Sequence, residues 1–257
     1  MMKLTLENFQ TGYPNWETKE INMSLFPGEL VALVGKNGSG KSTLVKGIMA
    51  LLKFQGKKIL GEDDLSGKTT KEMAKFISFM PQIFEVTYPT TVEEIILMGF
   101  NPDMGVFQNY SKKMKDQVKK ELDNFELAKY RQRDFLTLSE GQKQKVRLIR
   151  SLIRETPVLL LDEPESTLDF MVRHDMMELI LAQTKMRNCI SLLVIHDPNL
   201  ALRYADKIHM FKDGQVVACI DVQEEDEVTI ESKMRLVYGD VELIKTSEGK
   251  LLVDKKN

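Results

Sequence analysis

The sequence predicts an α/β fold in which buried parallel strands alternate with helices. Three short apolar runs support this prediction: LVALV at residues 30–34, VLLLD at residues 158–162 and SLLVIH at residues 191–196. Their length and continuous hydrophobicity are typical of strands that are covered on both faces. A helix-like segment, STLVKGIMALL, follows the first strand from residue 42. We therefore expect a parallel sheet that is packed between layers of helices.

The bulk composition limits the functional classes. The chain has 257 residues, enough for one domain with a substantial core. Its 36 basic and 38 acidic residues nearly balance, which argues against a protein that mainly coats nucleic acid. No apolar run approaches the ~20 residues that span a bilayer, and the N-terminal MMKLTLENF lacks the apolar core of a signal peptide. If the protein serves a membrane, we expect it to dock onto other subunits.

Two cysteines, Cys189 and Cys219, lie next to apolar, strand-like segments. Neither belongs to a CxxC or Cys/His spacing that would indicate a metal site. We therefore expect both to be small, reduced residues of the core.

The two ends of the chain are rich in strand patterns. KLTLENF and INMSLF alternate apolar and polar residues within residues 3–34, which predicts an N-terminal antiparallel β-subdomain. Near the other end, the segment IHMFKDGQVVAC predicts a β-hairpin around Asp213 and Gly214.

A helical pattern replaces the strand patterns from about residue 90 to residue 150. One amphipathic face is formed by apolar residues at helical spacing, namely Met114, Val118, Leu122 and Phe125. We expect a helical lobe at about residues 88–150, inserted into the α/β core of a single domain that covers residues 1–257.

Residues 35–42 read GKNGSGKS and fit the P-loop (Walker A) pattern. Its glycines allow a tight turn, and the backbone N–H groups and helix N-terminus bind anionic oxygens. Lys41 supplies a cation to the β- and γ-phosphates, and the Ser42 hydroxyl can coordinate Mg²⁺. A chance glycine-rich turn is the alternative, but the position between a buried strand and a helix favours nucleoside triphosphate binding through Gly35, Lys36, Asn37, Gly38, Ser39, Gly40, Lys41, Ser42 and Thr43.

Two carboxylates end the strand VLLLDEP. The carboxyl ends of parallel strands are where open sheets bind ligands. Asp162 is expected to hold Mg²⁺, and Glu163 is expected to orient and polarise the attacking water. Both carboxylates could instead cap the next helix, but the P-loop makes the catalytic interpretation the better one.

Residues 138–142 read Leu-Ser-Glu-Gly-Gln and precede a helix. They resemble the signature of the ABC ATPase superfamily, usually Leu-Ser-Gly-Gly-Gln, at the usual distance before the Asp-Glu strand end. Physically the motif is a serine-capped helix N-terminus, which is an anion site, although alone it would indicate only an ordinary capped helix. In the family this site closes on the γ-phosphate of a partner subunit. The resemblance therefore implies a head-to-tail dimer that sandwiches two ATP molecules between the P-loops and Ser139, Gly141 and Gln142.

Glu140 departs from the signature, since glycine is usual at this position. A carboxylate near a helix N-terminus is locally favourable, but it repels a γ-phosphate. Because Ser139 and Gly141 are intact, we expect a tolerated variation whose effect on turnover the sequence leaves open.

Three further family elements occur in order. Gln82 resembles the glutamine that senses Mg²⁺ and the attacking water and begins the loop facing the membrane subunit. Asp169, in STLD, resembles the carboxylate of the loop that communicates across the dimer. His196 resembles the histidine that contacts the γ-phosphate. Tyr13 is the best candidate for stacking on adenine, although Trp16 is close by.

The resemblance covers residues 3–253 and implies a RecA-like P-loop NTPase core. It further implies a catalytic set of Glu163, His196, Gln82 and Lys41, with Mg²⁺ held by Ser42, Gln82 and Asp162. The segments at residues 92–107 and 237–253 look most like importer ATPases for iron–siderophore, haem or cobalamin. The implied partners are ATP and ADP, a second copy, integral membrane permease subunits and, indirectly, a substrate-binding protein, but no nucleic acid. The implied location is the cytoplasmic face of the membrane.

Other interpretations stay open. A soluble ABC ATPase of DNA repair, translation or iron–sulfur assembly would share the motifs, but the chain lacks a long coiled-coil insertion and a second ATPase half. A non-hydrolysing ATP clamp is disfavoured by the intact Glu163 and His196. P-loop kinases and GTPases are disfavoured by the signature at residues 138–142.

Overall fold

The computed structural model describes residues 2–105, 108–247 and 249–255. Its centre is a six-stranded sheet in the order β11-β10-β4-β9-β8-β7. Neighbouring strands from β10 to β7 are parallel, and only β11 pairs antiparallel, at one edge. The predicted parallel sheet is therefore confirmed, with strands β4 (Leu30–Val34), β7 (Ile77–Met80), β8 (Val158–Asp162), β9 (Ile190–Ile195), β10 (Lys207–Lys212) and β11 (Gln215–Asp221).

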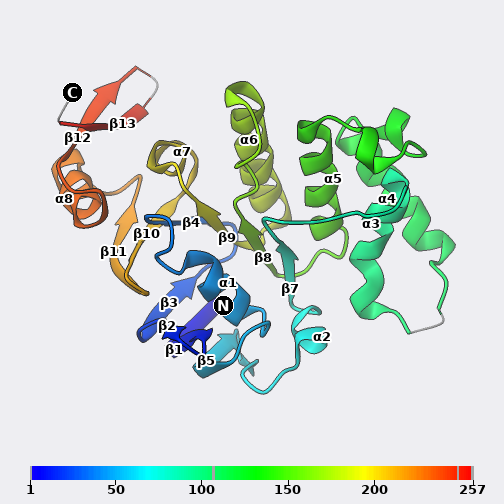
Figure 1. The fold of residues 1–257 in the computed structure, drawn as a ribbon, viewed down its shortest axis with the longest axis horizontal. Coiled ribbons are helices and arrows are strands. Elements are labelled where there is room, and N and C mark those ends of the chain that lie inside the picture. The colour runs from blue at the N-terminus through cyan, green and yellow to red at the C-terminus, as the bar shows by residue number, and fades with distance from the viewer. Residues whose placement is uncertain (1, 106–107, 248, 256–257) are drawn as a thin grey trace.

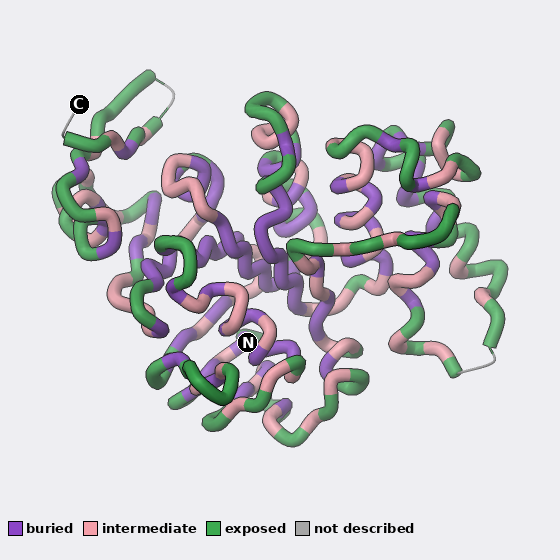
Figure 2. Tube along the Cα trace, viewed as in Figure 1, coloured by how far each residue is buried: buried purple, intermediate pink, exposed green. Residues whose placement is uncertain are grey.

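Every residue of β4, β8 and β9 is buried, because both faces of the sheet are covered (Figure 2). In β4, Leu30, Ala32 and Val34 join the core under α5, α6 and α7. Val31 and Leu33 point the other way, into the core shared with α1 and the N-terminal strands. Figure 1 shows these two layers on either side of the sheet. Continuous apolar runs are thus required because there are two cores to fill.

The N-terminal strands form a second, antiparallel sheet. Helix α1 (Lys41–Ile48) packs closely against it: a Cβ on Gly47 would lie 2.3 Å from Thr11 Oγ1, so only glycine fits there. The predicted antiparallel β-subdomain is confirmed, with strands β1 (Leu4–Tyr13), β2 (Trp16–Glu17), β3 (Ile21–Leu25), β5 (Phe54–Leu60) and β6 (Asp63–Asp64).

Between β7 and β8 the chain is helical. The four residues of the predicted amphipathic face all pack in one core, with Met114 partly buried and the others buried. That this segment forms a separate subdomain at about 88–150 stays a prediction. Its elements are α3 (Val92–Leu97), η1 (Met98–Asp103), α4 (Lys112–Asn124), η2 (Ala128–Tyr130), η3 (Phe135–Thr137) and α5 (Glu140–Leu152), preceded by the short α2 (Thr70–Met73).

The last third of the chain completes the sheet and adds a terminal hairpin. Asp213 and Gly214, both at positive φ, turn β10 into β11 as predicted. The side-chain amide of Asn199 docks the terminal hairpin by pairing with the backbone of Leu252, at 2.7 and 3.2 Å. The remaining elements are α6 (Phe170–Arg187), α7 (Pro198–Tyr204), α8 (Glu227–Tyr238), β12 (Val241–Thr246) and β13 (Gly249–Asp254).

The prediction that both cysteines are core residues is wrong for one of them. Cys189 is buried, but Cys219 is exposed, and both thiols are free. Cys219 lies on β11, the edge strand, where most side chains are only partly covered. Of the helices that the structure describes, none is both long and apolar enough to span a bilayer.

A lysine is buried in the N-terminal core. Lys58 of β5 is fully buried, and its Nζ donates to the carbonyl of Ile48, at the end of α1, over 3.1 Å. The ammonium also lies 3.8 Å from the centre of the Phe54 ring. Burial lowers the pKa of Lys58 from 10.5 to about 8. The charge therefore costs stability at neutral pH.

We expect Lys58→Met to stabilise the protein at pH 7. Between pH 8 and 10.5 the unfolded chain binds more protons than the folded one, so wild-type stability rises with pH in this window. The pKa shift from 10.5 to about 8 corresponds to about 3.4 kcal/mol at about 1.4 kcal/mol per unit. Less about 1 kcal/mol for the lost hydrogen bond, the gain should be roughly 2–2.5 kcal/mol. Urea unfolding at several pH values measures it. Parallel pH profiles for the two proteins would contradict the assignment.

Candidate functional site

The predicted catalytic residues meet at one edge of the main sheet. The parallel register aligns Val34 with Ile195, and Asp162 with Val194, so the carboxyl ends of β4, β8 and β9 lie together. Strand β7 ends beside β8 and is followed by Gln82. The P-loop, the two carboxylates, the histidine and the glutamine thus reach a common site from four separate segments.

A pocket of about 370 Å³ lies over the P-loop. Gly38 and Gly40 adopt φ of 76° and 102°, which glycine allows without strain. The Lys41 ammonium donates to the carbonyls of Gly35 (2.8 Å) and Lys36 (3.2 Å). Burial lowers the pKa of Lys41, while Glu163 and Asp162 act in the opposite direction. The pocket is lined by Trp16, Asn37, Gly38, Gly40, Lys41, Ser42, Thr43, Gln82, Glu163 and His196.

Ser42, which lines this pocket, is hydrogen-bonded to Asp162 at the end of β8. The Ser42 hydroxyl donates to Asp162 Oδ1 over 2.9 Å. Burial raises the pKa of Asp162, with a further contribution from the charge of Glu163. A hydroxyl and a carboxylate next to a phosphate-binding loop are the oxygen donors that Mg²⁺ prefers.

Glu163 is held from two sides. Its Oε1 lies 2.5 Å from His196 Nε2, and its Oε2 accepts from Gln82 Nε2 over 2.5 Å. The residue is buried and has φ of 53°, a left-handed conformation that is uncommon for a residue with a side chain. The structure therefore gathers Gln82, Glu163 and His196 into one hydrogen-bonded group beside the P-loop.

The signature residues lie elsewhere. Ser139 and Gln142 form a capping box at the start of α5, with Ser139 N donating to Gln142 Oε1 (3.1 Å). Asp169 caps α6 by accepting from Val172 N over 3.0 Å. Ser139, Gly141, Gln142 and Asp169 are absent from the lining of the P-loop pocket. Within the described chain, the second anion site is separate from the first.

The structure places the two candidate aromatic residues differently. Trp16, not Tyr13, lines the P-loop pocket. A Cβ on Gly40 would lie 2.1 Å from Trp16 Cη2, so the indole rests directly on the loop. Tyr13 pairs with Trp16 across β1 and β2 but does not reach the pocket lining.

Known proteins resemble this chain over most of its length. A family model described as "ABC transporter" matches residues 18–166. An uncharacterised ABC transporter ATP-binding protein of Methanocaldococcus jannaschii is 34% identical over 93% of this chain and 92% of its own length. The chain belongs to the ABC transporter ATP-binding family.

Further relatives share this fold and family. A probable siderophore transport system ATP-binding protein of Bacillus subtilis is 30% identical over 85% of this chain and 80% of its own. A hemin import ATP-binding protein of Rhodopseudomonas palustris is 35% identical, with 77% and 76% covered. Among solved structures, an ATP-binding cassette of an ABC transporter has a TM-score of 0.82 at 25% identity, covering 93% of this chain and 99% of its own.

Glu140, the unusual residue of this ABC signature, is neutralised locally. The Lys143 ammonium donates to Glu140 Oε1 over 2.8 Å, one helical turn away. This pairing reduces the repulsion that the carboxylate would exert on a phosphate near the start of α5.

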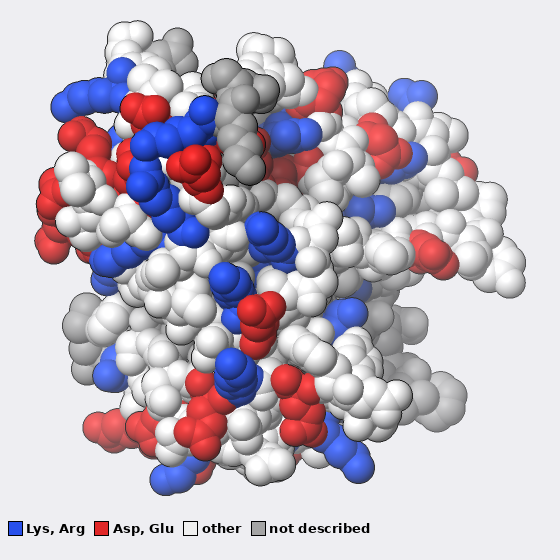
Figure 3. Space-filling model, turned by 60° about the vertical axis from the view of Figure 1, so that its left-hand side comes forward, with Lys and Arg blue, Asp and Glu red and all other residues white. Residues whose placement is uncertain are grey.

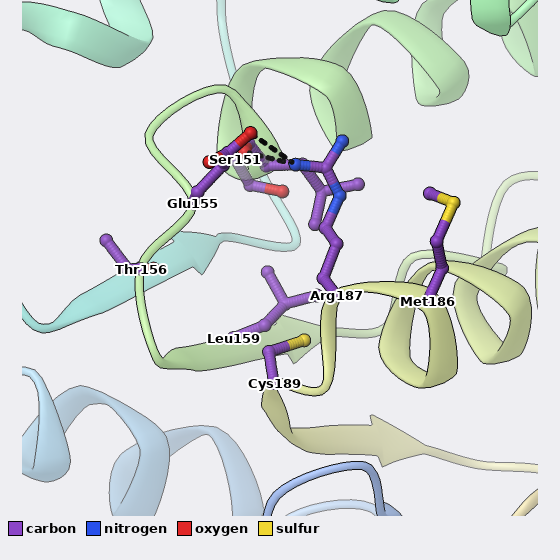
Figure 4. A pocket seen from close by; sticks show the side chains of 8 residues that line it. Ser151, Glu155, Thr156, Leu159, Met186, Arg187 and Cys189 are labelled. Atoms are coloured by element: carbon purple, nitrogen blue, oxygen red, sulfur yellow. Dashed lines mark hydrogen bonds and ion pairs between the residues drawn. The ribbon is translucent and has the colours of Figure 1, made fainter.

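A second pocket, far from the P-loop, lacks a group of free polar side chains like the one around Glu163. It has about 360 Å³ and lies at the amino ends of β8 and β9, opposite the P-loop edge. Arg187 extends across it (Figure 4), but its guanidinium is 3.0 Å from Glu121 and 3.8 Å from Glu155. The arginine is thus committed to structural ion pairs. Figure 3 shows acidic and basic side chains interspersed on the face that it presents.

Sequence reasoning missed Glu165. This carboxyl is buried two residues after Glu163, and its Oε2 has no hydrogen-bond partner among the described residues. Burial raises the pKa of Glu165 to about 7, and the negative charge of Glu163 adds to this shift. Hydrogen bonds from the backbone N–H groups of Glu165 and His196 lower the pKa and so offset part of it. The only signal in the sequence is a third acidic residue in DEPE.

Glu165 should make stability fall as pH rises. The unfolded chain loses its proton near pH 4.5 and the folded chain near pH 7, so stability decreases across this window and stays lower above it. Glu165→Gln should remove the decrease and stabilise the protein at pH 8 by roughly 2–3 kcal/mol. Denaturant unfolding at pH 5 and pH 8 tests this, with the exposed Glu62→Gln as control. Equal behaviour of the two variants would refute the assignment.

Proposed function

We propose that this ABC ATPase works as a head-to-tail pair that hydrolyses Mg-ATP to drive import of an iron–siderophore or related metal chelate. The arrangement of Gln82, Glu163 and His196 beside the P-loop carries the hydrolytic part of the proposal. The relatives named for siderophore and hemin transport support the cargo class.

In the proposed reaction, Glu163 polarises the attacking water. Gln82 and His196 hold its carboxylate in position, and His196 also stabilises charge that develops on the γ-phosphate. Lys41 contributes a cation to the phosphates from within the loop. Ser42, Asp162 and Gln82 would hold Mg²⁺, which supplies charge neutralisation to the phosphates. Trp16 is a better candidate than Tyr13 for stacking on adenine, because it lines the pocket.

A second copy would complete each site. Ser139, Gly141 and Gln142 begin a helix of 13 residues whose N-terminus favours an anion. They do not line the pocket of their own chain, so a phosphate can reach both anion sites only between two chains. A dimeric ATP-binding cassette with bound ADP and Pi, 25% identical with a TM-score of 0.72, supports this assembly.

A groove near Gln82 suits a permease. It has about 570 Å³ and runs between the core elements α1, α2 and β7 and the helical elements η1 and α5. Its basic side chains are Lys71, Arg150 and Arg154, of which Arg154 already pairs with Asp103 over 2.7 Å, and the described lining residues include no acidic one. The groove would therefore accept a helix that presents carboxylates or its C-terminal end. A substrate-binding protein and a position at the cytoplasmic face follow from the importer assignment.

Glu163→Gln should reduce ATP turnover by at least about a hundredfold while ATP binding persists, because the amide cannot accept a proton from water. ATP should then trap a stable dimer. Lys41→Ala should instead weaken ATP binding itself. Steady-state ATPase assays and nucleotide titrations separate the two effects. Normal turnover in Glu163→Gln would show that the base lies elsewhere.

Purification from native membranes should recover a polytopic permease with the wild-type chain. Lys71→Glu should reduce this recovery several-fold because it reverses a charge in the groove. Lys75→Glu is the matched control, since Lys75 is equally exposed but lies outside the groove lining. Recovery of only soluble assembly or repair proteins would favour the alternative of a non-transport ABC ATPase.

A further inference from the structure

The chain segment that follows β7 is held in place by side chains. Gln82 lies at its start and donates to Glu163, but residues 83–89 form no backbone-to-backbone hydrogen bond among the described residues. Phe84, two residues after Gln82, packs against the main core, whereas Ile83 between them is 71% exposed. The position of the Gln82 amide therefore depends on how Phe84 is fixed.

Arg147 of α5 supplies a contact to this backbone. Its guanidinium donates to the Phe84 carbonyl over 3.0 Å and lies 5.7 Å from the centre of the Phe84 ring. A second cation, Arg150, lies over the same ring at 4.4 Å. The ring also meets Phe135 edge-to-face, with ring centres 6.1 Å apart. Phe84 is thus held through both its carbonyl and its side chain.

Arg147 is also connected to the segment that follows Glu163. Its other terminal nitrogen lies 3.5 Å from Gln144 Oε1, and the buried Gln144 donates from its amide to Thr167 Oγ1 over 3.1 Å. Thr167 directly follows Ser166, whose hydroxyl donates to the Glu163 carbonyl over 3.0 Å. Because residues three apart share one face of a helix, this face of α5 contacts both segments that meet at the Glu163 carboxylate.

The two arginines are costly neighbours for the fold. Burial lowers the pKa of both Arg147 and Arg150, and the charge of Arg147 lowers the pKa of Arg150 further, while Glu140 opposes the shift of Arg147. The Nε atoms of both arginines are buried and have no hydrogen-bond partner among the described residues. Buried like charges that are incompletely paired cost stability. Their contact with Phe84 therefore explains the arrangement better than a contribution to folding does.

We propose that Arg147 is a positioning residue for ATP hydrolysis, which fixes residues 82–84 so that the Gln82 amide stays on the Glu163 carboxylate. Arg147 does not line the P-loop pocket, so it acts through Phe84 and Gln82 and not on the nucleotide. The proposal rests on the roles of Gln82 and Glu163 in the proposed reaction. Without the guanidinium, the segment would move and Glu163 would less often be held in place to polarise water.

The test is Arg147→Met in the full chain, because methionine keeps an apolar stem but cannot donate to the Phe84 carbonyl. The kcat for ATP should fall at least about tenfold, while KM changes less than about twofold because the P-loop is untouched. Lys145→Met is the matched control and should change neither, since residues two apart on a helix do not share a face. Arg147→Lys keeps the charge and a donor, so it should retain an intermediate kcat even where Arg147→Met folds poorly.

A double-mutant cycle with Gln82→Ala identifies the route. Once the amide is gone, Arg147→Met should change kcat by less than about twofold, because its effect passes through Gln82. Equal losses of kcat in both backgrounds would overturn the inference and leave the proposed reaction standing. So would an unchanged kcat, or a raised KM alone, in Arg147→Met. A normal kcat in Gln82→Ala would instead refute the role assigned to Gln82, and the inference with it.

Discussion

The carboxylate of Glu163, held between Gln82 and His196, is the interaction on which the functional architecture depends. Gln82 is 81 residues away in sequence, and the two meet only because β7 and β8 pair in parallel and end together. His196 arrives in the same way from β9. A one-residue slip in either pairing would turn these side chains to the other face of the sheet. The register of β7, β8 and β9 therefore positions the site residues as well as the core.

Local patterns could be predicted well because their physics is local. A glycine-rich loop between a strand and a helix, and carboxylates at a strand end, need no knowledge of distant residues. The position of Trp16 on the P-loop could not be predicted because it depends on a two-residue strand that folds the indole back onto Gly40. Cys219 was misassigned because periodicity does not distinguish an edge strand from a central one. Glu165 escaped notice since its burial is a property of the assembled fold.

The chemistry of this ABC ATPase is divided between two surfaces of one chain. The P-loop edge has a base, a cation and oxygen donors, whereas the helix N-terminus at Ser139 offers a second anion site on its own. In the proposed dimer, such a division would make the reaction conditional on association, because neither surface alone would surround a γ-phosphate. The pairing of Glu140 with Lys143 keeps the second site usable despite its extra carboxylate. Control of activity can therefore act through the interface, without any change in the catalytic residues.

Several polar groups of the site pair with one another within the chain. Lys41 donates to loop carbonyls, Ser42 donates to Asp162, and Glu163 accepts from Gln82 and His196. A nucleotide that binds to these groups would exchange these bonds for its own, so the net free energy of binding would be a difference between two hydrogen-bonded arrangements. The buried charges of Lys41 and Asp162, and the left-handed backbone of Glu163, raise the free energy of the chain before that exchange. Relief of these costs favours the state with bound phosphate. Because the loop that leads to α6 begins at Glu163, a change in the Glu163 backbone would link nucleotide binding to the position of this loop.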